Sequence, residues 1–168
     1  DKGELKKVVF SQGGYMTFDT IELSKDGDCI EVDCITSVPA GTKHFAFLTN
    51  DGICAIGLGN EILSLRKPNG WVDGYSGASG QRYFSPFGQL KDRGTVKIEY
   101  ANGGVSIYVN GSLFGTLTSQ PQILINGMGR YSFDTVEDFW VGTIYGFKYT
   151  TNGVTIGLDE LPSLSYND

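Results

Sequence analysis

One glycine- and serine-rich stretch, "KPNGWVDGYSGASGQRYFSPFGQLKDRG" at residues 67–94, gathers aromatic and polar side chains that could bind a ligand. A loop of this length inside a compact domain is uncommon and usually functional. Aromatic rings on a surface loop can stack on a flat ligand face, while nearby polar groups hydrogen-bond hydroxyls. We therefore expect a binding site between Asn69 and Tyr83, with help from Arg130 and Tyr131. Its candidate residues are Trp71, Asp73, Tyr75, Arg82, Tyr83, Arg130 and Tyr131.

A structural role is the alternative for the same aromatic residues. Phe84 and Phe87 would then close one end of the core, and Trp71 would fold onto the core as a lid. The sequence leaves both interpretations open.

Charge separates this loop from the rest of the chain. The chain has a net charge of −6, whereas residues 66–94 carry a local balance of +3. An acidic chain is a poor nucleic-acid binder, because such binding needs a basic face that releases counterions. We expect no nucleic-acid partner, and a positive loop favours an acidic polysaccharide as its ligand.

Other site chemistries lack their residues. His44 is the single histidine, no Gly-x-Ser-x-Gly occurs, and no glycine-rich loop links a strand to a helix. Asp134, Glu137 and Asp138 form an acidic cluster, but their spacing matches no defined calcium loop. The sequence therefore predicts no cofactor and no assigned metal site, with calcium left open.

The elements that must position these residues are short strands and tight turns. In "GGVSIYVNGSLFGTLTS", residues 103–119, apolar and polar residues alternate with period two on either side of Asn110-Gly111. Asn-Gly suits a type I′ turn, so the strand should return antiparallel through residues 113–118. Similar pairs at 69, 102, 110, 126 and 152 separate short β-rich runs elsewhere. The pattern predicts an all-β sandwich or barrel with little helix.

Bulk properties indicate one domain, residues 1–168. A chain of 168 residues with 40% hydrophobic content can bury a core, and no linker divides it. No apolar run approaches the length of a membrane span, so we expect no membrane insertion. The start "DKGELKKVVF" lacks a signal-peptide core and an initiator Met, which favours an excised domain or a processed chain.

Cysteine usage favours folding in a reducing compartment. Cys29 and Cys34 lie on one expected strand with opposite-facing side chains, so a bridge between them is disfavoured. A pairing of Cys34 with Cys54 stays open, although small buried side chains are the simpler interpretation.

The motifs "VKIEYANGGVSIYVNGSLFGTLTS" and "FWVGTIYGFKYT" resemble the laminin-G-like, or concanavalin A-like, jelly-roll superfamily. The tail "NGVTIGLDELPSL" is similar to versions attached to phage and bacterial surface proteins. This resemblance implies an antiparallel two-sheet jelly-roll β-sandwich. The expected core is Ile30, Val32, Val96, Ile98, Ile107, Val109, Trp140, Ile144 and Phe147.

The enzymes of that superfamily offer a test of catalysis. Those that resemble β-glucanases carry Glu-x-Asp-x-x-Glu on one strand, because hydrolysis needs two carboxyl groups. This chain has Glu31 and Asp33 but Thr36 in place of the second glutamate. We therefore expect Glu31 and Asp33 to be solvent-facing residues of a strand and no catalysis.

The resemblance then implies a non-catalytic carbohydrate-binding module for cell-surface attachment, as in a phage attachment structure or a bacterial adhesin. Its partner would be a cell-surface glycan, and the module would act in a multicopy assembly on a virion or extracellular surface. The alternative is a structural or capsid-decorating virion domain that contacts proteins without binding sugar. A glycoside hydrolase is the third interpretation.

Overall fold

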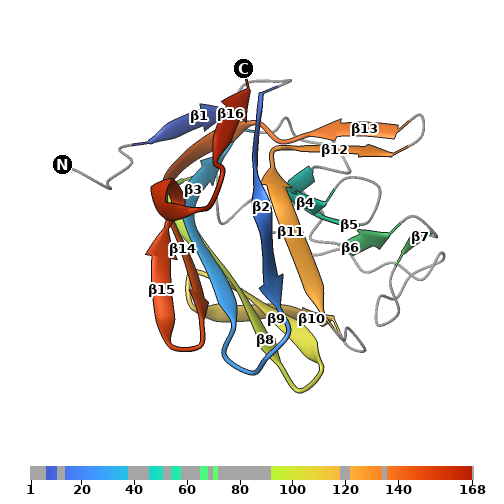
Figure 1. Cartoon of the computed structure of the whole chain (residues 1–168), viewed down its shortest axis with the longest axis vertical. Helices are drawn as coiled ribbons and strands as arrows, with labels where there is room; N and C mark the ends of the chain where they lie inside the picture. Colours follow the sequence, from blue (N-terminus) through green and yellow to red (C-terminus); the bar gives the residue numbers. More distant parts are fainter. Residues whose placement is uncertain are drawn as a thin grey trace.

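The computed structural model describes residues 7–10, 14–37, 46–50, 54–57, 65–67, 70–71, 92–117, 122–133 and 136–167. Two antiparallel sheets form a sandwich, and one short 3-10 helix, η1 (Leu158–Glu160), is the helical element among these residues (Figure 1). The predicted all-β fold with two antiparallel sheets is confirmed. No helix in the described ranges is long and apolar enough to cross a membrane.

Sheet A has the strand order β1-β14-β3-β8-β9-β10, with β15 also paired to β14. Every pairing in it is antiparallel, and β3 lies between β14 and β8. Its strands are β1 (Val8–Phe10), β3 (Cys29–Thr36), β8 (Gly94–Ala101), β9 (Gly104–Val109), β10 (Ser112–Leu117), β14 (Gly142–Thr151) and β15 (Val154–Gly157).

Sheet B has the order β16-β2-β11-β4-β5-β6-β7, and a separate hairpin joins β12 to β13. In Figure 1, β2 and β11 run side by side and the β12–β13 hairpin projects away from them. The strands are β2 (Tyr15–Leu23), β4 (Ala46–Asn50), β5 (Cys54–Gly57), β6 (Leu65–Lys67), β7 (Gly70–Trp71), β11 (Ile123–Met128), β12 (Arg130–Phe133), β13 (Val136–Phe139) and β16 (Ser165–Asn167).

The predicted hairpin around Asn110-Gly111 forms between β9 and β10. Both turn residues have positive φ, 51° at Asn110 and 85° at Gly111, as a type I′ turn requires. The same geometry closes β8–β9 at Asn102 and β14–β15 at Asn152. Asn-Gly therefore forms three turns of sheet A, each between two strands that follow one another in the sequence.

At Asn126-Gly127 the expected turn is wrong. The pair lies inside β11, and the strand continues through it although the register with β2 shifts between Ile125 and Gly127. From Ile125↔Ile21 to Gly127↔Thr17 the extra residues lie on β2, so the irregularity belongs to β2 and the dipeptide stays in the strand.

The motif "FWVGTIYGFKYT", residues 139–150, is divided between two strands. β13 ends at Phe139, and β14 begins at Gly142. A side chain at Gly142 would stand 2.4 Å from the carbonyl oxygen of Ile35 and 2.5 Å from the Trp140 ring. Trp140 is fully buried in this break, so the close approach around its ring needs the glycine.

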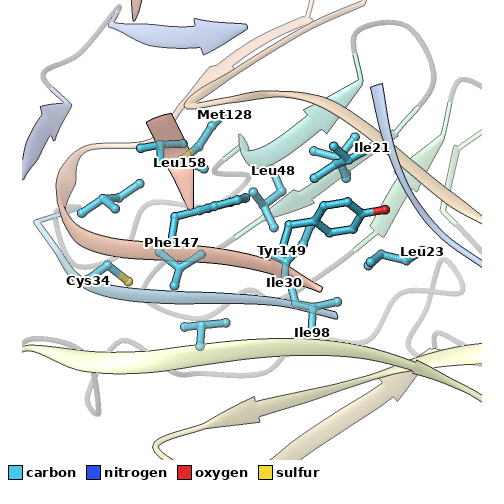
Figure 2. Close-up of a cluster of buried hydrophobic side chains, with 14 of the residues drawn as sticks. Ile21, Leu23, Ile30, Cys34, Leu48, Ile98, Met128, Phe147, Tyr149 and Leu158 are labelled. Carbon is cyan, nitrogen blue, oxygen red and sulfur yellow. The ribbon is translucent and has the colours of Figure 1, made fainter. Parts of the chain in front are cut away.

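The core lies between the two sheets, and all nine side chains expected to fill it are buried. Figure 2 shows part of it, with Phe147 and Tyr149 of β14 beside Leu48 of β4 and Ile21 of β2. The Tyr149 hydroxyl donates a 2.6 Å hydrogen bond to the carbonyl oxygen of Glu22 on β2. Tyr149 thus links the sheets while its ring stays among apolar neighbours.

Hydrogen bonds to Asp28 connect the turn before β3 to the end of β14. Its buried carboxylate accepts hydrogen bonds from the backbone N–H groups of Ser24 and Lys25, both at 3.0 Å, and from the Thr151 hydroxyl at 2.8 Å. Burial alone would raise its pKa, but these hydrogen bonds outweigh that effect and hold the pKa of Asp28 below its usual value. The turn before β3 is thereby joined to the end of β14.

The cysteine interpretation can also be checked. Cys34 is buried, Cys29 on the same strand is only partly buried, and both are free, so the Cys34–Cys54 pairing does not form. Burial raises the pKa of the Cys34 thiol to about 12, as expected for a small apolar side chain in the core.

Candidate functional site

A groove runs along the outer face of sheet A, on the side away from the core. It consists of two hollows of about 470 and 430 Å³ that share Glu31 and Thr95 in their lining. One wall of the larger hollow comes from residues 157–159, which include part of η1. We call this surface the groove, and the strands that form its floor are β14, β3, β8 and β9.

Strand β3 places two carboxylates on this floor. Burial alternates along β3, so Ile30, Val32 and Cys34 face the core while Glu31 and Asp33 face the groove. The expectation that these two carboxylates leave the core face is confirmed. They are two residues apart on one strand, which separates their Cα atoms by about 6.6 Å.

Thr36 lies on the opposite face of the same strand. It is buried, and its hydroxyl has no hydrogen-bond partner. A glutamate at this position would therefore point into the core and could not complete a pair with Glu31. On the same strand, the carboxylate that accompanies Glu31 in the groove is Asp33.

Asp33 is held by Arg93, the residue before β8. The guanidinium donates two hydrogen bonds, Nε to Oδ1 at 3.0 Å and Nη2 to Oδ2 at 2.7 Å. Its Cζ also lies 4.1 Å from the centroid of the Tyr145 ring. The hydrogen bonds with Asp33 raise the pKa of Arg93 above its usual value. Such bidentate and stacked contacts fix both orientation and charge, although this pair is exposed to solvent.

A β-bulge in β14 brings Tyr145 to this position. Ile144 pairs with Cys34 and Gly146 pairs with Asp33, so Tyr145 is the extra residue between them. Bulges often redirect a side chain next to a functional site. Gly146 has no side chain, and a Cβ at this position would lie 3.7 Å from the Cβ of Asp33. The groove floor beside Asp33 is therefore not filled by a side chain from residue 146.

Glu31 lies between two lysines. In the sheet register it pairs with Lys148 of β14 on one side and with Lys97 of β8 on the other. Lys97 pairs in turn with Tyr108 of β9, and Tyr108 pairs with Leu113 of β10. We call Lys148, Glu31 and Lys97 the charged row. Directly opposed side chains in antiparallel strands lie about 5 Å apart, so these charges act on the same part of a bound molecule.

Four of the loop residues expected to bind the ligand lie outside the described residues, namely Asp73, Tyr75, Arg82 and Tyr83. Their role in binding stays a prediction. For Trp71 the backbone is described, and it pairs with Arg66 at the sheet-B edge formed by β6 and β7.

Arg130 and Tyr131 are likewise described by their backbone. They lie in β12, opposite Phe139 and Asp138 of β13. This hairpin contacts β4 of sheet B, whereas the groove lies on the outer face of sheet A.

The acidic cluster considered for calcium is divided in the same way. Glu137 and Asp138 belong to β13, and Asp134 lies outside the described residues. Among the residues that the structure describes, no three His, Cys, Asp or Glu side chains gather as metal ligands would.

Comparison with known proteins finds similar solved structures but no matching family. No protein-family model matches this sequence, and no curated protein matches it. Two solved structures are similar. One is the alginate lyase AlgAT5 from polysaccharide lyase family 7, with 18% identity, a TM-score of 0.44, 89% of this chain covered and 63% of that chain covered. The other is the β-glucanase of Bacillus licheniformis, with 13% identity, a TM-score of 0.31, and 86% and 69% of the two chains covered.

The chain spans less than two thirds of the length of the alginate lyase chain. Its own strands form an antiparallel two-sheet β-sandwich, as the sequence pattern predicts. The expectation of a non-catalytic attachment module, and with it the expectation that the chain is not an enzyme, is contradicted. Both similar structures are carbohydrate-cleaving enzymes.

Proposed function

We propose that this protein is a glycoside hydrolase that cleaves a polysaccharide in the groove on the outer face of sheet A. The observation that carries the proposal is the placement of Glu31 and Asp33, two carboxylates of one strand, on the floor of one groove. Glycosidases use two carboxyl groups that lie roughly 5 to 9.5 Å apart across the scissile bond. A Cα separation of about 6.6 Å is compatible with this range.

The two carboxylates have different surroundings, which suggests different roles. Asp33 is oriented by two hydrogen bonds from Arg93 and keeps a fixed negative charge at the groove floor. In the proposed reaction it stabilises, or attacks, the positively charged anomeric carbon that forms as the bond breaks. Arg93 would be a positioning residue that acts through Asp33.

Glu31 would be the proton donor and acceptor. It transfers its proton to the glycosidic oxygen as the bond to the leaving sugar breaks, and the carboxylate that remains then lies between two ammonium groups. Lys97 and Lys148 would balance the negative charge that Glu31 carries after the transfer. In the following step Glu31 recovers a proton from the attacking water, so acid and base are both regenerated.

The proposal is tested by measuring new reducing ends from a panel of polysaccharides. Wild type should release them, and Glu31→Gln and Asp33→Asn should each lower the rate by about 10²- to 10⁴-fold while remaining folded. Glu22→Gln, an exposed carboxylate on β2 of sheet B, is the matched control and should keep full activity. An unsaturated, ultraviolet-absorbing product in place of a hydrolytic one would contradict hydrolysis.

We further propose a setting for this activity, supported by the sequence motifs quoted above. The domain would belong to a larger phage or bacterial surface protein, present in several copies on a virion or extracellular surface, and would cut a cell-surface glycan. Multiple copies compensate for modest affinity at each site. Particles carrying Glu31→Gln should then still assemble but should no longer remove the glycan from cells.

The loop between Asn69 and Tyr83 is proposed as an additional contact for the polysaccharide. Trp71 and Tyr75 would stack on sugar rings, and Arg82 would hydrogen-bond their substituents. Trp71→Ala and Arg82→Ala should raise KM and leave kcat nearly unchanged, since uniform binding is lost. A fall in kcat alone would place these residues in a different role. No cofactor or metal is part of the proposal, so exhaustive chelation should leave the rate unchanged.

A further inference from the structure

Positive and negative side chains alternate along the described part of the groove. In the charged row, Glu31 has a lysine on either side. Lys97 in turn has a second carboxylate nearby, because its Nζ lies 3.9 Å from Oε2 of Glu99 on the same strand. Neither hollow therefore presents a run of cations.

Arg93 is the cation best suited to bind a carboxylate, and it is already engaged. Two of its N–H groups point to Asp33, and its planar face lies on Tyr145. A sugar carboxylate could still reach the remaining N–H groups of this guanidinium, but Asp33 already balances its charge, and displacing Asp33 would leave that carboxylate without its partner.

The described charges at the groove sum to a small excess of negative charge. Arg93, Lys97 and Lys148 are opposed by Glu31, Asp33, Glu99 and Asp159. A polyanion would carry a negative charge on each repeat and would meet at least one of these carboxylates at every position. Like charges placed close together cost free energy and reduce affinity.

We propose that the groove accepts an uncharged polysaccharide and discriminates against polyanionic ones such as polyuronates. This inference rests on the proposed function, which it sharpens by naming the substrate class. It also differs from the expectation of an acidic ligand, which depended on the positive loop between Asn69 and Tyr83.

The chemistry of the floor suits neutral sugars. Carboxylates accept hydrogen bonds from hydroxyl groups and ammonium groups donate to them, so alternating charges match a surface rich in hydroxyls. Beyond Lys97 the same row continues into Tyr108 and then Leu113, whose side chain is 60% exposed. This apolar end can cover the face of a pyranose ring, which carries C–H groups rather than charge.

Matched polymer pairs test the inference, because each pair shares a backbone and differs in charge. Hydroxyethyl cellulose is compared with carboxymethyl cellulose, and dextran with carboxymethyl dextran. Binding is measured by affinity electrophoresis with Glu31→Gln, so that cleavage does not interfere, at low and high salt. Release of reducing ends by wild type is measured in parallel.

Stronger retention by the neutral member of a pair is the expected result, with the difference shrinking as salt screens the repulsion. Equal or stronger retention by the carboxymethyl polymer at low salt would overturn the inference, as would no retention by any of the four. Preferential retention by the neutral polymers without release of reducing ends would contradict the proposed hydrolase activity. It would still support the inference about substrate charge.

A charge variant provides the second arm. Glu99→Gln removes a carboxylate beside Lys97 and should improve retention by the carboxymethyl polymers by about two- to fivefold, as for an exposed ion pair. Glu22→Gln, which removes the same charge from sheet B, should leave retention unchanged. An equal gain in both variants would show that net charge alone matters, and would overturn the role given to the groove.

Discussion

The two faces of strand β3 differ in what they require of their side chains. On the inner face, Ile30, Val32 and Cys34 are all buried, and any apolar side chain of suitable size would satisfy that environment. On the outer face, Glu31 and Asp33 depend on partners from other strands, at distances and angles that few substitutions reproduce. The inner face therefore supplies stability that tolerates change, whereas the outer face supplies a specific arrangement that contributes little stability.

The largest effect expected from this comparison comes from the outer face. Glu31→Gln should lower the hydrolytic rate by about 10²- to 10⁴-fold without changing the melting temperature. Val32→Ala, at the adjacent inner position, should destabilise the protein and leave the rate per folded molecule nearly intact. Assays at equal folded fraction, checked by thermal unfolding, would separate the two faces, and a parallel loss of rate and stability in Glu31→Gln would contradict the separation.

A second pair probes the same contrast on β9, where Ile107 is buried and Tyr108 faces the groove. Ile107→Ala should lower the free energy of unfolding by roughly 2 to 5 kcal/mol, since it removes buried methyl groups and leaves a cavity. Tyr108→Ala should cost less stability and instead weaken binding. Urea denaturation measures the stability of both variants. An unchanged midpoint in Ile107→Ala would refute the assignment of faces.

Asp28 is a buried exception to the rule that the interior tolerates change. Asp28→Asn should cost about 1.5 to 3 kcal/mol, because an amide cannot accept all three hydrogen bonds that the carboxylate accepts. Its pKa is lowered on folding, so its contribution is present above pH 3.8 and is lost as the pH falls below that value. Unfolding curves at a series of acidic pH values should show a weaker pH dependence in Asp28→Asn than in the exposed control Asp26→Asn.

For Cys34 we expect stability to fall as the pH rises in the alkaline range. Its folded pKa of about 12 lies above the ordinary value of 9.0, so the neutral thiol stabilises the fold fully below pH 9.0. That contribution is lost as the pH rises from 9.0 towards 12. Cys34→Ala should start from a lower stability yet lose less of it over this range, and an identical slope in both proteins would argue against a buried thiol.

Substitution of Arg93 should combine a small effect on stability with a loss of rate. Arg93→Lys keeps the charge but loses the bidentate geometry, and the pair is exposed, so the free energy of unfolding should change by less than about 1 kcal/mol. The rate should nevertheless fall, because Asp33 loses its orientation. Rates and unfolding midpoints measured together would show whether Arg93 acts through Asp33 or merely stabilises the fold.

The sequence predicted the inner face well because burial in a sheet needs only period-two alternation, which is a local property. The hairpin at Asn110-Gly111 was predictable for the same reason, since both turn residues must tolerate positive φ. In contrast, Asn126-Gly127 resembles a turn in sequence but continues strand β11, because pairing with β2 decides its role.

The groove could not be predicted, because its residues meet through register between distant strands. Arg93 and Asp33 are 60 residues apart, and the position of Tyr145 depends on a bulge in β14. The sequence did offer one signal, the Glu31-Val32-Asp33 alternation on a single strand. The longer Glu-x-Asp-x-x-Glu spacing obscures this signal, because it gives weight to Thr36, which faces the core and cannot take part.

The position of β14 beside β3 also determines the order in which the molecule can fold. β3 is synthesised early, yet its neighbour β14 ends at Thr151, so their pairing must wait until almost the whole described chain has left the ribosome. Until then one edge of β3 lacks its hydrogen-bonded neighbour in sheet A. Such long-range pairing makes folding slow, on a scale of milliseconds to seconds for similar topologies. The nascent chain is therefore most prone to aggregate just before β14 completes the groove.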